Sequence, residues 1–163
     1  MVVLDVILDG FFAAIAAIGF GAISNPPLRA FRYIAVLAAV GHALRYCLMT
    51  FLGADITTGS LCGSLAIGMM SLWLARKCYC PMTVLYIPAL LPMIPGKFAY
   101  NMIFSQLMFL RNMDIAIERE KYMEMFFTNT MVTGTVIFVL AVGATLPQFI
   151  FPEKASSITR RNK

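Results

Sequence analysis

The stretch MFFTNTMVTGTVIFVLAVGATLPQFIFP, residues 125–152, runs for 28 residues without an Asp, Glu, Lys or Arg. A transmembrane helix needs about 20 apolar residues to cross ~30 Å of hydrocarbon, so this stretch is long enough to span a bilayer. Three further charge-free stretches, at 10–28, 56–75 and 78–96, contain 19, 20 and 19 residues. A membrane β-barrel would instead show strands of about ten residues with alternating polarity, and we find no such alternation. The pattern predicts an all-α integral membrane protein.

The composition of the whole chain supports this prediction. Of its 163 residues, 60% are apolar and only 13% are charged, and the mean hydropathy is +0.81, outside the range of soluble domains. The first apolar stretch is not a secretory signal by this reading, because Asp5 and Asp9 precede it instead of Lys or Arg. The net charge of +5 is spread over loop ends and the tail, so we expect no nucleic-acid binding.

Helix-breaking residues divide the chain into about five crossings. The predicted helices lie, in order, at 3–24, 31–51, 56–75, 82–110 and 125–146. The fourth cannot be one straight helix, because prolines remove helical hydrogen bonds and clash with the preceding turn. Its breakers are Pro88, Pro92, Pro95 and Gly96. We therefore expect an interrupted segment there, either crossing the bilayer or folding back as a re-entrant hairpin.

The basic residues set the predicted orientation, because short cytoplasmic loops carry an excess of Lys and Arg. With five crossings, one side receives eight basic residues and the other three, which places the N-terminus outside and the C-terminus in the cytoplasm. If 82–110 is a re-entrant hairpin, the two sides receive seven and four basic residues, so this alternative is also acceptable. We expect a single transmembrane domain at 1–150, with 111–124 at the surface, and a basic cytoplasmic tail at 151–163.

The break in the fourth segment is the predicted substrate site. Backbone groups released by prolines cannot face lipid, and interrupted helices in secondary transporters direct free N-termini at anionic groups. Gly96 would open the second half-helix, followed by a cation at Lys97. Asn101 and Ser105 would follow on the same face. We predict a carboxylate site here; the alternative is a kinked, packed helix whose Lys97 snorkels to the interface.

Three ionisable groups fall where lipid is expected. In a helical hairpin that turns near Pro27, the numbers of facing residues sum to about 54, which Asp9 and Arg45 satisfy. We therefore predict that Asp9 pairs with Arg45, either as a structural ion pair or as a proton or substrate relay. His42, one turn deeper, serves either packing or proton relay.

No metal or catalytic centre is expected. His42 is the only histidine, and Cys78 and Cys80 form one close pair without a second pair or a nearby histidine, so we expect reduced thiols. No combination of nucleophile and base, deep carboxylate pair or glycine-rich phosphate loop supports an enzyme. We therefore expect neither enzymatic activity nor a bound cofactor.

The last predicted helix adds two polar candidates, Asn129 and Thr133, which lie one turn apart. They either face a cavity or bond back to carbonyls of their own helix. Small residues at four-residue spacing favour close helix contact, within the chain or towards a partner. These are Ala13, Ala17 and Gly21, then Gly59, Ser60, Gly63, Ser64 and Gly68.

The run IPALLPMIPG at 87–96, followed by Ala99 and Tyr100, resembles the proline-rich signature of the small subunit of the bacterial threonine/serine exporter family. The turn NPPLRAFR at 25–32 is similar as well. Further similar positions are Gly41, His42, Arg45 and Asn129. The resemblance covers almost the whole chain, and the P-x-x-x-P-x-x-P-G run is its most specific part.

The resemblance implies a multi-pass component of a secondary exporter in the bacterial cytoplasmic membrane. Such a component would move small hydroxy amino acids or related carboxylates, driven by an ion gradient, for which we expect protons. It would assemble with a larger membrane subunit, and it adds Pro92, Pro95 and Tyr100 to the predicted substrate site. The alternative is an accessory subunit that stabilises a larger transport partner without forming the substrate site.

Overall fold

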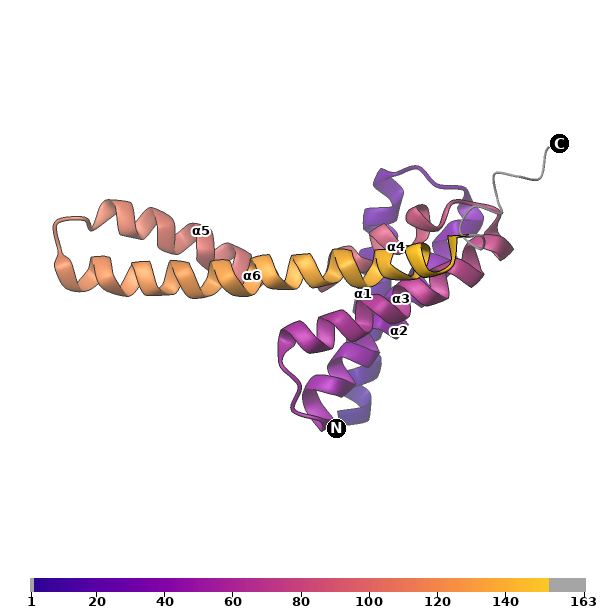
Figure 1. The fold of residues 1–163 in the computed structure, drawn as a ribbon, viewed down its shortest axis with the longest axis horizontal. Coiled ribbons are helices and arrows are strands. Elements are labelled where there is room, and N and C mark those ends of the chain that lie inside the picture. Colours follow the sequence, from indigo (N-terminus) through magenta and orange to yellow (C-terminus); the bar gives the residue numbers. More distant parts are fainter. Residues whose placement is uncertain (1, 153–163) are drawn as a thin grey trace. The chain divides into compact units, whose positions relative to one another are not determined.

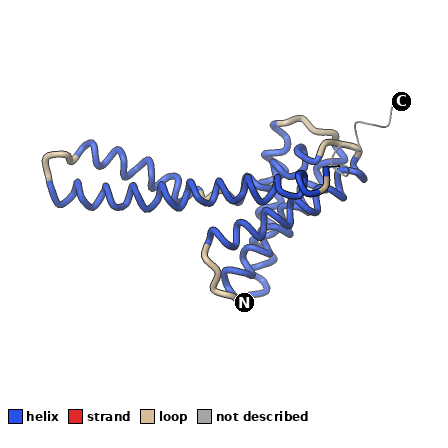
Figure 2. Tube along the Cα trace, viewed as in Figure 1, coloured by secondary structure: helices blue, strands red, loops and turns tan. Residues whose placement is uncertain are grey.

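The computed structural model describes residues 2–152, and every regular element in this range is helical. The elements are α1 (Val2–Ile23), α2 (Leu28–Phe51), α3 (Ile56–Cys78), α4 (Met82–Leu90), the 3-10 turn η1 (Leu91–Met93), α5 (Gly96–Arg111) and α6 (Ala116–Ile150) (Figures 1 and 2). Four of them, α1, α2, α3 and α6, are long and apolar enough to cross a membrane, and the interrupted α4 and α5 supply a fifth span if they cross together. The prediction of an all-α protein with about five spans, the fourth interrupted, is confirmed.

The chain packs as two compact units. The first unit contains Met1–Met93 and Val139–Lys163, and therefore α1 to α4, η1 and the C-terminal part of α6. The second unit is Ile94–Phe138, which holds α5 and the N-terminal part of α6. Most of the predicted basic tail, residues 153–163, lies outside the described residues, so its prediction stays untested.

Capping explains where α3 begins and ends. The Asp55 carboxylate accepts hydrogen bonds from the backbone amides of Thr57 and Thr58 at 2.9 and 3.1 Å, which satisfies two otherwise free donors of the first turn. The Thr58 hydroxyl donates to the same carboxylate at 2.6 Å, and this bond is the main reason that the pKa of Asp55 is lowered. At the other end, Tyr79 adopts a left-handed conformation with φ 53° and stops the helix.

The helix α6 is longer than the predicted 125–146. It begins at Ala116, so most of the polar stretch 111–124 is helical as well as exposed. Glu, Arg, Lys and Met are good helix formers, and Lys121 and Glu118 form an ion pair at 3.6 Å one turn apart. Charges mark where a hydrophobic span begins, but they do not prevent the helix from starting earlier.

The stripes of small residues pack inside the first unit. A Cβ atom at Gly10 would lie 3.1 Å from the Ala39 carbonyl oxygen, so α1 and α2 approach closely there. A Cβ atom at Gly63 would lie 2.9 Å from the Gly41 carbonyl oxygen, and one at Gly68 would lie 2.6 Å from the carbonyl oxygen of Ala144 in α6. Below 3.0 Å, as at Gly63 and Gly68, only glycine fits, so the small residues of α3 serve helix contacts within this chain.

Candidate functional site

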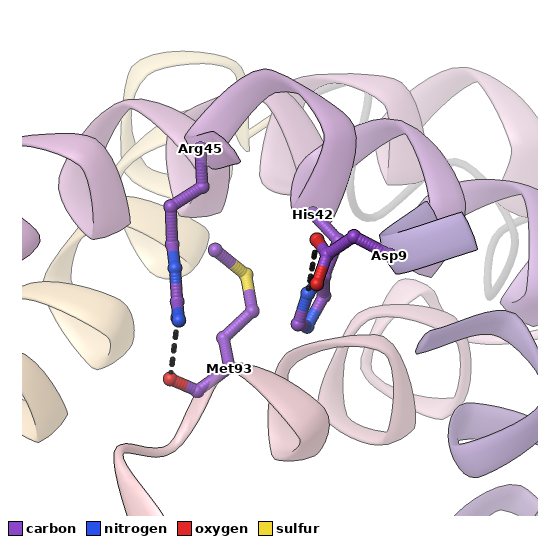
Figure 3. Close-up of polar contacts among 4 residues, drawn as sticks. All are labelled: Asp9, His42, Arg45 and Met93. Atoms are coloured by element: carbon purple, nitrogen blue, oxygen red, sulfur yellow. Dashed lines mark hydrogen bonds and ion pairs between the residues drawn. The ribbon is translucent and has the colours of Figure 1, made fainter. Parts of the chain in front are cut away.

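The acid Asp9 of α1 meets the histidine of α2 inside the first unit. Nδ1 of His42 lies 3.2 Å from Oδ2 of Asp9 (Figure 3). The two ends of this contact differ in burial, because the His42 side chain is 9% exposed and that of Asp9 is 39% exposed. A carboxylate and an imidazole at this distance can share one proton, since histidine titrates near neutral pH.

The predicted partner of Asp9 was therefore wrong: it is His42 and not Arg45. The reason lies in the turn. Because α1 ends at Ile23 and α2 already begins at Leu28, the centre of the hairpin falls between 25 and 26, and facing residues sum to about 51 instead of 54. Asp9 and His42 satisfy this corrected sum. Asp9 still acts electrostatically on Arg45, one turn away from His42 on α2.

The Arg45 guanidinium binds the end of the first half of the broken fourth segment. Its Nη1 donates a hydrogen bond of 2.8 Å to the carbonyl oxygen of Met93, the last residue of η1 (Figure 3). Beyond the break, the amides of Phe98 and Ala99 bond to the carbonyl of Pro95. The Met93 carbonyl lies at the C-terminal end of η1, where no following helical turn supplies an amide donor. A cation is favourable at the C-terminal end of a helix, and the Arg45 guanidinium occupies this position.

Glycines of α3 make room for this arrangement. A Cβ atom at Gly59 would lie 3.3 Å from Cγ of Arg45, and one at Gly63 would lie 2.6 Å from Cε of Met93. The Met93 side chain is fully buried and, in Figure 3, is seen between the guanidinium and the Asp9–His42 pair. The small residues of α3 therefore set how close Arg45 and Met93 come to the helix axis.

The imidazole of His42 keeps one free side. Its Nε2 atom is buried and makes no hydrogen bond with a described residue, although the backbone of Pro92 also approaches the ring. Asp9 and Arg45 are the charged groups that act on this ring. The cluster thus combines one acid, one permanent cation and one titratable base, held by α1, α2 and the end of η1.

The second unit contains most of the other predicted site residues. No hydrogen bond or ion pair between described residues connects their side chains to one another. Lys97, exposed at the start of α5, makes no hydrogen bond or ion pair with a described residue. Tyr100 is 69% exposed and stacks on Phe104 with ring centroids 6.2 Å apart. Gly96 is exposed and Pro95 is buried.

Two buried polar residues of the second unit, Ser105 and Asn129, bond to their own helices. The Ser105 hydroxyl donates to the Asn101 carbonyl at 2.6 Å, and the Asn129 amide donates to the Met125 carbonyl at 2.6 Å. The hydroxyl of Thr133 is buried without a hydrogen-bond partner among the described residues. Of the two alternatives predicted for Asn129, a cavity-facing side chain or a bond to its own helix, the structure shows the bond to its own helix.

A family model described as threonine/serine exporter, ThrE, matches residues 9–150 of this sequence. This range begins at Asp9 and includes the whole cluster, the second unit and most of the first unit. The chain belongs to the threonine/serine exporter family. The resemblance seen in the proline-rich run is thereby confirmed, and the helices make the chain a multi-pass membrane protein of this family. No solved structure matches the chain.

Sequence reasoning missed Met93 as a part of the site in this member of the threonine/serine exporter family. Met93 contributes its backbone carbonyl, which any residue would supply, so its side chain carries no signal. The signal that was present is the neighbouring Pro92 and Pro95, which predict released carbonyl groups without telling which one a side chain takes.

Proposed function

We propose that this chain is the small subunit of a two-component secondary exporter that moves threonine, serine or related small carboxylates out of the cell. A larger membrane subunit of the same family would complete the complex, and a proton gradient would drive it. The observation that carries this proposal is the cluster of Asp9, His42 and Arg45 inside the membrane-spanning helices. Ionisable groups in such positions mark proton and substrate pathways.

The cation for the substrate carboxylate would be Arg45. The guanidinium carries five N–H donors in a planar fork that suits a carboxylate, and among the described residues Arg45 donates to one neutral carbonyl. Asp9, the acid nearest to it, is engaged by His42. An incoming carboxylate would therefore find an arginine whose donors are only partly used. Lys97 is the second candidate cation, and the experiment below ranks the two.

Proton coupling would run through the Asp9–His42 pair. When His42 is neutral, the charges of Asp9 and Arg45 cancel, and a proton on the pair leaves one net positive charge. The ammonium group of an amino acid and a protonated imidazole would both need Asp9, so they would compete for it. Such competition is what exchange of an inward proton for an outward substrate requires, because the two should not bind together.

The test is efflux from vesicles loaded with labelled threonine, serine or a dicarboxylate. The vesicles contain the chain alone, a larger subunit alone, or both, with and without an imposed pH gradient. We expect threonine and serine efflux only from vesicles that contain both subunits, and faster efflux with an inward proton gradient. Absence of efflux of any of these solutes in all combinations would refute the exporter proposal.

Two variants separate a substrate-binding subunit from an accessory one. Arg45→Met should abolish efflux while the two subunits still copurify, and Lys97→Met should reduce it less. If both variants leave efflux unchanged, the chain only supports its partner. The stripes of small residues argue against that alternative, because they are used inside this chain, at Gly63 against Gly41 and at Gly68 against Ala144.

A further inference from the structure

The basic residues at one end of the first unit have no acidic partner in the part of the chain that the structure describes. Arg29 and Arg32 lie in the first turns of α2, and Arg76 and Lys77 lie in the last turn of α3, all four exposed. The sequence contains no Asp or Glu at 10–54 or at 56–113, and none of the four forms an ion pair with a described residue. Among residues 2–152, four positive charges are therefore left without a paired acid there.

Neighbouring thiols do not offset this charge. Cys80 lies in the turn between α3 and α4, and burial, together with a hydrogen bond to Cys78, raises its pKa to about 12. The Cys80 thiol therefore stays neutral at physiological pH. The described acids of the first unit are also remote along the helices, since Asp5 and Asp9 lie in the first half of α1 and Asp55 lies at the beginning of α3.

Contacts with tyrosines hold the two arginines in place and join the two turns. The Arg29 guanidinium lies over the ring of Tyr79, 5.7 Å from its centroid, which connects the start of α2 to the turn after α3. Arg32 lies 4.8 Å from the centroid of Tyr33 and donates to its hydroxyl at 3.1 Å. Cation–π contacts of this kind favour these positions of the two guanidinium groups.

This end of the first unit lies at the boundary of the apolar spans. At this end α1 stops at Ile23, α2 starts at Leu28, and α3 stops just before Tyr79. Trp73, one turn before Arg76, is 72% exposed, and Tyr79 is 65% exposed. Exposed Trp and Tyr beside Lys and Arg are typical of the depth at which lipid headgroups lie.

We propose that these four basic residues, Arg29, Arg32, Arg76 and Lys77, bind the phosphate headgroup of an anionic phospholipid. Arginines suit phosphate oxygens because they donate in pairs. Ile23 and Leu28, 82% and 88% exposed, offer apolar surface to the acyl chains at the same end. Loops that merely fix orientation need only the right number of charges, whereas a headgroup site also depends on the Arg29–Tyr79 contact.

The single tryptophan of the chain makes the site measurable, because Trp73 is one turn from Arg76. The full chain is placed in phosphatidylcholine vesicles, and bromine-labelled phosphatidylglycerol or bromine-labelled phosphatidylcholine is added as the quencher. We expect phosphatidylglycerol to quench Trp73 at lower mole fractions and in a saturable way. Equal quenching by the two lipids would overturn the proposal.

Variants test which residues carry the preference. Each basic residue near a membrane surface contributes about a fivefold preference for anionic lipid, so Arg29→Gln with Arg76→Gln should lower the preference about 30-fold. The matched control is Arg111→Gln with Arg119→Gln in the second unit, which removes the same charge and should change nothing. An equal loss in this control would contradict a local site.

Two further arms distinguish a built lipid site from its alternatives. Tyr79→Leu keeps all four charges but removes the ring under Arg29, and it should lower the preference several-fold. No effect of this variant would reduce the cluster to a set of orienting charges. Inorganic phosphate in the buffer should not relieve the quenching by phosphatidylglycerol; relief at millimolar phosphate would show a site for a free anion instead.

Discussion

In the first unit, the ionisable side chains of the cluster reach across to other helices: His42 to Asp9 of α1, and Arg45 to the end of η1. In the second unit, the buried Ser105 and Asn129 donate to carbonyls of the helix on which they lie. A contact between helices fixes the position of both, and losing it leaves a buried group without a partner. A bond within a helix adds little to tertiary structure, so substitution there should be tolerated.

The most damaging substitution should be Arg45→Met. It leaves the Met93 carbonyl without its donor and removes the proposed substrate cation. We expect efflux to fall at least tenfold and the unfolding free energy in detergent to fall by about 2 kcal/mol, as for other hydrogen bonds to charged groups. Arg45→Lys is the control, because it keeps the charge but not the planar fork. Full efflux and unchanged stability in Arg45→Met would remove the distinction drawn between the two units.

The next largest effect should come from separating Asp9 and His42. Asp9→Asn and His42→Gln both remove the group that can share a proton, and each should reduce gradient-driven efflux several-fold. Efflux measured between pH 5.5 and 8 should lose its pH dependence in both variants. If the double variant behaves worse than the sum of the two single variants predicts, the pair is not the unit of coupling that we propose.

Substitutions in the second unit should do much less. Ser105→Ala and Asn129→Ala each remove a bond to the carbonyl of the same helix, and we expect losses below about 1 kcal/mol with efflux within twofold of the parent. Thermal unfolding in detergent and the vesicle assay measure both quantities. A tenfold loss of efflux in Asn129→Ala would show that this side chain faces the substrate after all.

The smallest effect concerns Asp55, a residue of the first unit whose bonds are nevertheless local to α3. Its folded-state pKa is lowered, chiefly by the Thr58 hydroxyl, below its unfolded value of about 3.9. The carboxylate therefore contributes stability above this value, and the contribution is lost as the pH falls through the lower, folded-state pKa. We expect the gap in melting temperature between the parent and Asp55→Ala to be constant from pH 8 to pH 5 and to narrow once the pH falls below about 4. A gap that keeps its full width through acid titration would contradict this.

Much of the fold follows from the sequence because lipid favours long apolar stretches. The apolar stretches and the helix-breaking residues between them predicted α1, α2 and α3 to within three residues at each end, and the prolines predicted the interruption before Gly96. The start of α6 was missed, since a charged segment outside the lipid can still be helical. Hydropathy predicts whether a segment lies in lipid or in water, and it does not predict where the helical backbone begins.

The cluster was predicted in its members but not in its contacts. Counting from a turn locates facing residues only as well as the turn itself is known, and an error of one and a half residues in its centre moved the partner of Asp9 by one helical turn, to His42. Asn129 was ambiguous for another reason, because its amide can donate to its own helix as easily as to a neighbour. Only three-dimensional coordinates separate these cases.

The depth of Asp9 determines how the membrane voltage acts on the proposed proton. Asp9 lies seven residues after the beginning of α1 at Val2, or ~10 Å along the helix, about a third of ~30 Å of hydrocarbon. A proton that reaches Asp9 from the N-terminal side would therefore cross about a third of the electric field, roughly 0.8 kcal/mol per 100 mV out of about 2.3 for the whole membrane. Most of the electrical work would be released only after the proton leaves the pair towards the opposite side, which makes that departure the more voltage-sensitive half of the cycle.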